Sequence, residues 1–259
     1  MSAATAAASA PASSGRAGRT FPRGLIIQPL AILAALGAYA LWVTTAEITA
    51  TEANTLAPSN LWGYLVEHLA LTFTAAGIVL VIAIPLGVLL TRRSLRAARA
   101  PVLAIANIGQ AAPAIGLVVL LAFWLGFGFW ASVVALVLYA ALPVLRNTML
   151  GITGVDQRLI DAGRGMGMSS TGVLLRVELP LAVPLMLAGI RTALVLLVGT
   201  ATLAAFIDGG GLGILITTGV SLFLTNVLVA GSLLVALLAL AIDWLGRVAE
   251  HVATPKGLS

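Results

Sequence analysis

Long stretches without any charged residue constrain this sequence more than any other feature. No Asp, Glu, Lys or Arg occurs across residues 100–145, and uncharged apolar runs also cover residues 24–46 and 69–91. About 20 apolar residues are enough to cross the hydrocarbon core of a bilayer as a helix. Only 9% of the residues are charged, whereas about 25% is usual for a soluble domain. The sequence therefore predicts an integral membrane protein.

The basic residues set the expected topology, because Lys and Arg close to the ends of spans mark the cytoplasmic side. A dense cluster follows the second run: Arg92, Arg93, Arg96 and Arg99. We expect an all-α polytopic bundle of six spans with both termini cytoplasmic. The spans are expected at about 25–45, 69–91, 101–125, 129–145, 184–207 and 218–242. No internal repeat indicates a second domain, so residues 24–246 form one transmembrane domain in this interpretation.

The two ends of the chain are expected to be cytoplasmic tails. Residues 1–23 are mainly Ala, Ser, Gly and Pro and have too few large apolar side chains to form a core, so we expect disorder there. Residues 247–259 form the second tail. The arginines at the start, the first apolar run and the Ala38-Tyr39-Ala40 triplet also resemble a cleavable secretory signal. Cleavage there would leave the remaining topology unchanged.

The segment of residues 160–180, which reads IDAGRGMGMSSTGVLLRVELP, is the longest charge-bearing interruption between the apolar runs. Its glycines end helices readily, and Ser169 or Ser170 could cap a new helix. We expect two short helices on the cytoplasmic side, joined near Gly167. Leu179-Pro180 should close the segment before the chain returns to the bilayer. This is where the protein should meet a soluble partner.

The spacing of this segment resembles the loop of ABC importer permeases, which reads EAA, three residues, Gly, nine residues, then I-x-L-P. Here the anchors are Asp161-Ala162-Gly163, then Gly167, then Val177-Glu178-Leu179-Pro180. The resemblance implies the type I ABC importer permease (MetI-like) fold, with a coupling loop at 151–180 that fits a groove on a cytoplasmic ATPase. An ordinary loop with this spacing by chance is the alternative. The implied coupling residues are Asp161, Ala162, Gly163, Arg164, Gly165, Met166, Gly167, Met168, Leu179 and Pro180.

The same resemblance implies the partners. They are a pair of ATPase subunits, a second permease subunit that is identical or homologous, and an external substrate-binding protein. The chain would lie in the lipid bilayer of the bacterial plasma (inner) membrane. It contains no G-x-x-x-x-G-K-[ST] loop, so ATP would be bound by the partner ATPase and the chain itself would need no cofactor.

Several other function classes are disfavoured. The sequence has no cysteine, and its two histidines, His68 and His251, have no partner at ligand spacing, so we expect neither a metal site nor catalysis. His68 is expected at the membrane interface. Nucleic-acid binding is unlikely despite the net charge of +5, because the basic residues lie at the ends of apolar runs.

Further segments resemble the permeases that import osmoprotectants such as glycine betaine, choline and carnitine. They cover residues 142–148, 164–168, 188–194, 199–207 and 210–213. The sequence departs from that subgroup at Ala111-Ala112 and at Asp208, both near the expected pathway or outer gate. Two alternatives stay open. One is a permease of the same architecture for another small solute, such as an amino acid or a sulfonate, and the other is a secondary carrier that needs no ATPase.

Five residues are candidates for lining the transport pathway: Asn107, Gln110, Pro113, Arg191 and Asp208. Pro113 removes a helical hydrogen bond inside the third span, and interrupted helices often line pathways in transporters. A packing kink, with the two amides bonded to neighbouring helices, explains the same pattern.

Two of these candidates are charged. Arg191 is the one charge inside an apolar run. It either reaches the inner interface or pairs with the loop or a second permease subunit. Asp208 either attracts a cation or marks the outer end of a span.

Overall fold

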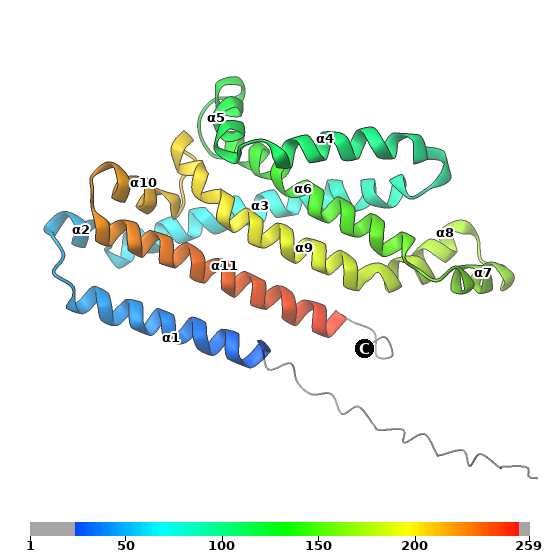
Figure 1. Ribbon diagram of the computed structural model, residues 1–259, viewed down its shortest axis with the longest axis horizontal. Coiled ribbons are helices and arrows are strands. Elements are labelled where there is room, and N and C mark those ends of the chain that lie inside the picture. Colours follow the sequence, from blue (N-terminus) through cyan, green and yellow to red (C-terminus); the bar gives the residue numbers. More distant parts are fainter. Residues whose placement is uncertain (1–23, 254–259) are drawn as a thin grey trace, which may run out of the picture.

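The computed structural model describes residues 24–253, and all regular elements in this range are helical. The expected tail at 1–23 and residues 254–259 lie outside the described residues. Figure 1 shows the long helices side by side along the longest axis of the molecule. These are α1 (Gly24–Thr45), α3 (Pro58–Leu90), α6 (Phe129–Thr153), α9 (Leu179–Ala201) and α11 (Thr225–Ala253). The shorter helices are α2 (Ala50–Thr55), α4 (Arg99–Ala111), α5 (Ala114–Leu125), α7 (Gln157–Gly165), α8 (Ser170–Val173) and α10 (Gly213–Ser221).

Five helical segments within residues 24–253 are long and apolar enough to cross a membrane, and a sixth exists if α4 and α5 count as one broken span. These two short helices meet at an angle of 102° next to Pro113. Figure 1 shows α4 running along the bundle and α5 standing away from it. The kink expected in the third span is therefore a complete break, because Ala112 and Pro113 both have extended ψ angles of 144° and 119°.

The core is built around α6, which packs against both α3 and α9. Small residues let α6 and α9 approach closely, as is usual where helices pack in membranes. A β-carbon added at Gly189 of α9 would lie 2.5 Å from the Asn147 β-carbon of α6. One added at Gly151 of α6 would lie 2.9 Å from the Ala182 carbonyl oxygen. Both glycines hold the α6–α9 contact at a distance that no larger residue allows.

Several helices have other bounds than the expected spans: α3 begins at Pro58, α6 ends at Thr153 and α9 begins at Leu179. The sixth span, expected at 218–242, begins at Thr225, because α10 ends at Ser221 and Phe223 adopts a left-handed φ of 55°. It also continues to Ala253, so residues 247–253 are helical and not part of a tail.

His68, which the sequence places at the membrane interface, packs inside the bundle between α3 and α9. Its side chain is fully buried, and Nε2 lies 3.0 Å from the carbonyl oxygen of Val198 on α9. Since α3 begins at Pro58, His68 lies in the third turn of this helix.

Candidate functional site

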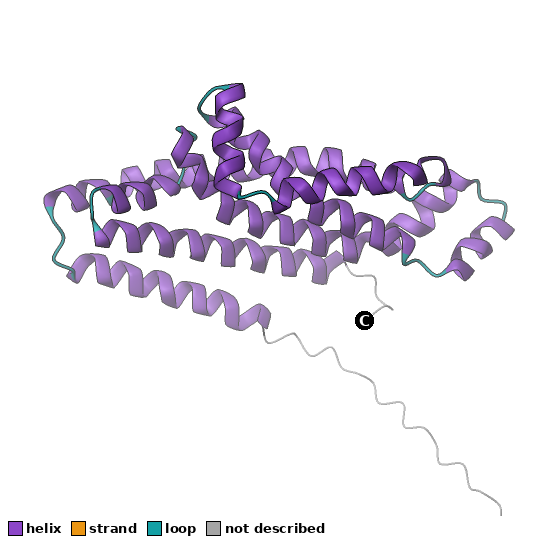
Figure 2. Ribbon diagram, turned by 45° about the horizontal axis from the view of Figure 1, so that its top comes forward, coloured by secondary structure: helices purple, strands orange, loops and turns teal. Residues whose placement is uncertain are grey.

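The helices α7 and α8 form one end of the molecule, beyond the ends of the long helices (Figures 1 and 2). The side chain of Asp156 begins α7 by accepting a hydrogen bond from the backbone N–H of Arg158 at 2.9 Å. Ser169 begins α8 in the same way, since its hydroxyl accepts from the N–H of Gly172 at 3.2 Å. The two short helices expected in this segment are present, and Ser169, not Ser170, is the cap.

Gly167 joins the two helices in a left-handed conformation with φ of 81°. The N–H of Gly167 donates to the Arg164 carbonyl at 2.9 Å, and the N–H of Met168 donates to the Gly163 carbonyl at 3.2 Å. This pair of bonds is the Schellman motif, which satisfies the last carbonyls of a helix. The motif requires φ > 0 at one residue, and this explains why glycine occupies position 167.

A small apolar contact holds the two helices together and leaves the rest of the segment on the surface. Ile160 and Gly163 of α7 are buried, as is Val173 of α8. The outward residues are exposed: Asp161, Ala162, Arg164, Gly165, Met166 and Gly167. Met166 is 72% exposed. The arrangement presents an apolar side chain within a polar surface, which suits contact with a soluble protein.

Leu179 and Pro180 lie elsewhere and do not close the segment. The chain is helical from Ser170 to Ile207 without a break. Pro180 is the second residue of α9 and follows directly on the π-helical turn Leu174–Glu178. Leu179 packs with the Ile152, Ala182 and Met186 cluster. Of the ten expected coupling residues, these two are part of the span and not of the exposed surface.

Gln110 and Arg191 meet in an open hollow of about 550 Å³ between α4, α9 and α11. Its polar lining also includes the hydroxyls of Thr192 and Thr200 and the charges of Asp243 and Arg247, and none of its lining residues is aromatic. The hollow brings together two of the five candidate pathway residues.

Arg191 pairs with α11 of its own chain and not with the loop. Its guanidinium lies 3.0 Å from Glu250 and 3.6 Å from Asp243. Asp243 also pairs with Arg247 at 2.9 Å, as its (i, i+4) spacing predicts. A β-carbon on Gly246 would lie 2.7 Å from Cγ of Arg191. Glycine at this position therefore makes room for Arg191 to lie across α11.

The other three candidates lie apart from this hollow. Asn107 accepts a hydrogen bond from Arg146 at 2.7 Å, which matches the alternative of an amide bonded to a neighbouring helix. Pro113 lies at the break after α4. Asp208 is exposed and adopts a left-handed φ of 60° in the loop between α9 and α10.

Sequence reasoning missed Glu67, which holds this loop in place. Its carboxylate accepts a hydrogen bond from the N–H of Gly211 at 2.8 Å. A β-carbon on Gly210 would lie 2.6 Å from the same carboxylate. Two glycines with positive φ angles, 84° and 89°, thus bring the loop backbone onto α3. The run of glycines after Asp208 was the available signal, because it indicates close backbone approach.

A second carboxylate, Glu52, fixes the short helix α2 outside the spans. It forms a capping box with Thr49, whose backbone N–H donates to the Glu52 carboxylate at 2.8 Å. This backbone hydrogen bond lowers the pKa of Glu52 below its ordinary value of 4.5, and hydrogen bonds from Asn226 add to the effect. The contacts tie α2 to the start of α11.

The comparisons with known proteins agree with this architecture. The family model described as "binding-protein-dependent transport system inner membrane component" matches residues 83–251. The chain is 41% identical over 192 residues to the glycine betaine/carnitine/choline transport system permease protein OpuCB of Bacillus subtilis (strain 168), covering 74% of this chain and 88% of that protein. It is 40% identical over 205 residues to the osmoprotectant import permease protein OsmW of Salmonella typhimurium, covering 76% and 94%.

A solved structure of the MetNI methionine ABC transporter in an inward-facing conformation superimposes with a TM-score of 0.65. The two sequences are 28% identical, and the match covers 75% of this chain and 96% of that one. The match of the family model to well over half of the chain confirms the resemblance seen in the sequence. The chain belongs to the family of binding-protein-dependent transport system inner membrane components, and it is a membrane-embedded permease subunit of an ABC importer.

Proposed function

We propose that this permease imports small quaternary ammonium osmoprotectants of the glycine betaine, choline and carnitine class. It works as a pair with an identical or homologous permease subunit. Two ATPase subunits bind its cytoplasmic surface, and an external binding protein delivers the substrate. The chain performs no chemistry itself, and ATP is bound and hydrolysed by the partner.

The observation that carries the ATPase contact is the exposed surface of α7 and α8. The Schellman motif at Gly167 fixes the angle between the two helices, so the surface keeps its shape without support from a partner. The start of α1 and the end of α11 lie together, since Trp244 donates a hydrogen bond to the Leu25 carbonyl at 2.9 Å. In Figure 1 both lie at the ends of these two helices that point toward α7 and α8, and α7 and α8 extend well beyond them. This supports a cytoplasmic location for the described ends of the chain and for the coupling surface.

The substrate class rests on the relatives, which are named as permeases for glycine betaine, carnitine and choline. The hollow at Arg191 supports a pathway that passes solutes without holding them. Its two arginines share Asp243 on its wall, and Glu250 of α11, which lies outside the lining, pairs with Arg191 and balances the second positive charge. Quaternary ammonium groups are bound tightly by aromatic cages, and the hollow has no aromatic lining residue. Tight binding therefore belongs to the external binding protein.

Import of an amino acid is the second candidate, because the structural neighbour is a methionine transporter. The relatives with osmoprotectant names share a higher identity with the chain, 41% against 28%. This difference favours the osmoprotectant class.

The test is uptake by the complete assembly in proteoliposomes with the binding protein encoded beside this chain. Labelled glycine betaine, choline, carnitine, methionine and a sulfonate are supplied in turn, with ATP enclosed. We expect ATP-driven uptake of at least one quaternary amine and none of methionine or the sulfonate. Uptake of methionine or the sulfonate alone would overturn the substrate class, and calorimetry with the binding protein should give the same ranking.

A further inference from the structure

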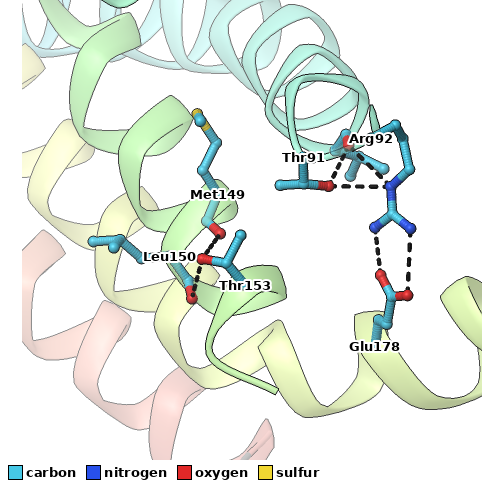
Figure 3. A network of polar contacts seen from close by, with 7 residues as sticks. Thr91, Arg92, Met149, Leu150, Thr153 and Glu178 are labelled. Atoms are coloured by element: carbon cyan, nitrogen blue, oxygen red, sulfur yellow. Dashed lines mark hydrogen bonds and ion pairs between the residues drawn. The ribbon is translucent and has the colours of Figure 1, made fainter. Parts of the chain in front are cut away.

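Arg92 and Glu178 form an ion pair that sequence reasoning did not identify, and Figure 3 shows it in detail. Both terminal nitrogens of Arg92 face both carboxylate oxygens of Glu178, with 3.3 Å between Nη1 and Oε1 and a closer contact between Nη2 and Oε2. A bidentate contact between an arginine and a carboxylate fixes the relative orientation of the two side chains in addition to pairing their charges. Arg92 Nε also donates to the hydroxyl of Thr91 at 3.1 Å. The guanidinium is thus held on both sides.

The two partners come from elements that are far apart in the sequence. Arg92 follows the last turn of α3, and Glu178 lies between α8 and α9. The Glu178 side chain is only 8% exposed and that of Arg92 is 31% exposed. A buried carboxylate without a partner is strongly unfavourable. The pair therefore holds the end of α3 to the base of the α7–α8 segment.

Around this ion pair the segment is not tightly packed. A hollow of about 470 Å³ lies between the end of α3, the end of α6 and the α7–α8 segment. Arg92 and Glu178 are both on its wall, together with Thr153 and Ile160. Because side chains do not fill this space, a shift of the α7–α8 segment would reach the end of α3 through the ion pair and through the apolar cluster in which Val88 and Leu179 pack.

The chain is also irregular where Glu178 lies. Residues Leu174–Glu178 form a π-helical turn between α8 and α9. Such turns are rare and are often found at functional sites. The wider turn places Glu178 on the side of the helix that faces Arg92. The same turn is a point at which the α7–α8 segment can change its angle to α9.

We propose that the Arg92–Glu178 ion pair transmits movement of the α7–α8 segment to α3 during the ATPase cycle. Arg92 and Glu178 are positioning residues in this role, since neither is among the exposed residues of the α7–α8 surface and neither lines the hollow at Arg191. The proposal rests on the proposed ATPase contact at α7 and α8. Without the ion pair, ATP hydrolysis would still move the segment, but α3 would follow it less closely.

The experiment uses the complete transporter in proteoliposomes and measures solute imported per ATP hydrolysed. The variants are Glu178→Gln, Arg92→Gln, the double variant and Arg92→Lys, which keeps the charge but loses the paired contact. Arg93→Gln is the matched control, because Arg93 is an adjacent, exposed arginine with no carboxylate within 4 Å among residues 24–253. Copurification of the ATPase with each variant is measured first.

We expect every variant to retain the ATPase. The ratio of transport to hydrolysis should fall roughly 2- to 30-fold in both Gln variants and less in Arg92→Lys. The double variant should be no worse than the more affected single variant, because both remove the same contact. Arg93→Gln should match the wild type.

Three results would overturn the proposal: a wild-type ratio in the single variants, an additive loss in the double variant, or an equal loss in Arg93→Gln. A reduced amount of transporter with an unchanged ratio counts as the first of these, since it indicates a role in folding alone. The proposed function fails separately, if the wild-type chain holds no ATPase or imports no solute on ATP hydrolysis.

Discussion

Replacing Gly167 tests whether the angle between α7 and α8 matters for the ATPase contact. Gly167 has φ of 81°, and a β-carbon there would meet no atom within 4 Å. The cost of a side chain is therefore backbone strain alone and not a clash within the chain. For a residue such as Ala the left-handed conformation costs about 1–2 kcal/mol. If the strain is released by opening the turn, this free-energy cost makes the population of molecules with the native angle between α7 and α8 roughly 5- to 30-fold smaller.

The series Gly167→Asn, Gly167→Ala and Gly167→Val increases the strain in steps. Asn tolerates the left-handed region, whereas a β-branched residue is an outlier there. ATPase affinity should therefore fall in the order Asn, Ala, Val, measured by pull-down with membrane insertion as the control. Gly165→Ala is the matched variant, because Gly165 is exposed on the same surface, lies in α7 without a positive φ and has no atom within 4 Å of an added β-carbon.

Gly165→Ala should bind the ATPase nearly as the wild type does. Equal affinity across the Gly167 series would refute the argument that the Schellman turn fixes the surface. A loss in Gly165→Ala as large as that in Gly167→Ala would show instead that added bulk on the surface, and not the angle, reduces binding.

Three further predictions concern other parts of the chain. Pro113→Ala should restore a helical hydrogen bond and reduce the 102° bend between α4 and α5. Distances between spin labels on these two helices should therefore lengthen, and the transport rate should change while the assembly still forms. Gly246→Ala should push Arg191 away from α11 and lower the free energy of unfolding by about 1–3 kcal/mol, as overpacking does. Its Tm should be lower than that of a control variant with a Gly→Ala change at an unhindered helix position. Glu52 has a lowered pKa, so its contribution to stability is present above pH 4.5 and is lost as the pH falls further. The protection of the α2 amides against hydrogen exchange, taken relative to the intrinsic rate at each pH, should therefore fall in acid and show no such step in Glu52→Gln.

Features that depend on local sequence were predicted well. Uncharged runs identified the spans because the bilayer demands long apolar helices, and the glycine and serine spacing identified the two short helices joined at Gly167. The family could be recognised because the same segment has a defined spacing of anchors.

Features that depend on packing were not predicted. Pro113 was expected to kink one span, but nothing in the sequence gives the 102° angle, which depends on the neighbours of α5. Arg191 was assigned no partner on α11, because its carboxylates lie more than 50 residues later and become close only when α9 and α11 pack. The Arg92–Glu178 pair was missed for the same reason, since it joins residues 86 positions apart.

Site-specific cross-linking between this chain and its ATPase tests the central claim most directly. The sequence contains no cysteine, so a single cysteine carrying a photoactivated cross-linker reports one position without background. Met166, which is 72% exposed on the α7–α8 surface, is the test position, and Phe223, which is 91% exposed in the turn between α10 and α11, is the control. We predict a cross-link to the ATPase from position 166 and none from position 223. Cross-linking from 223 with none from 166 would contradict it.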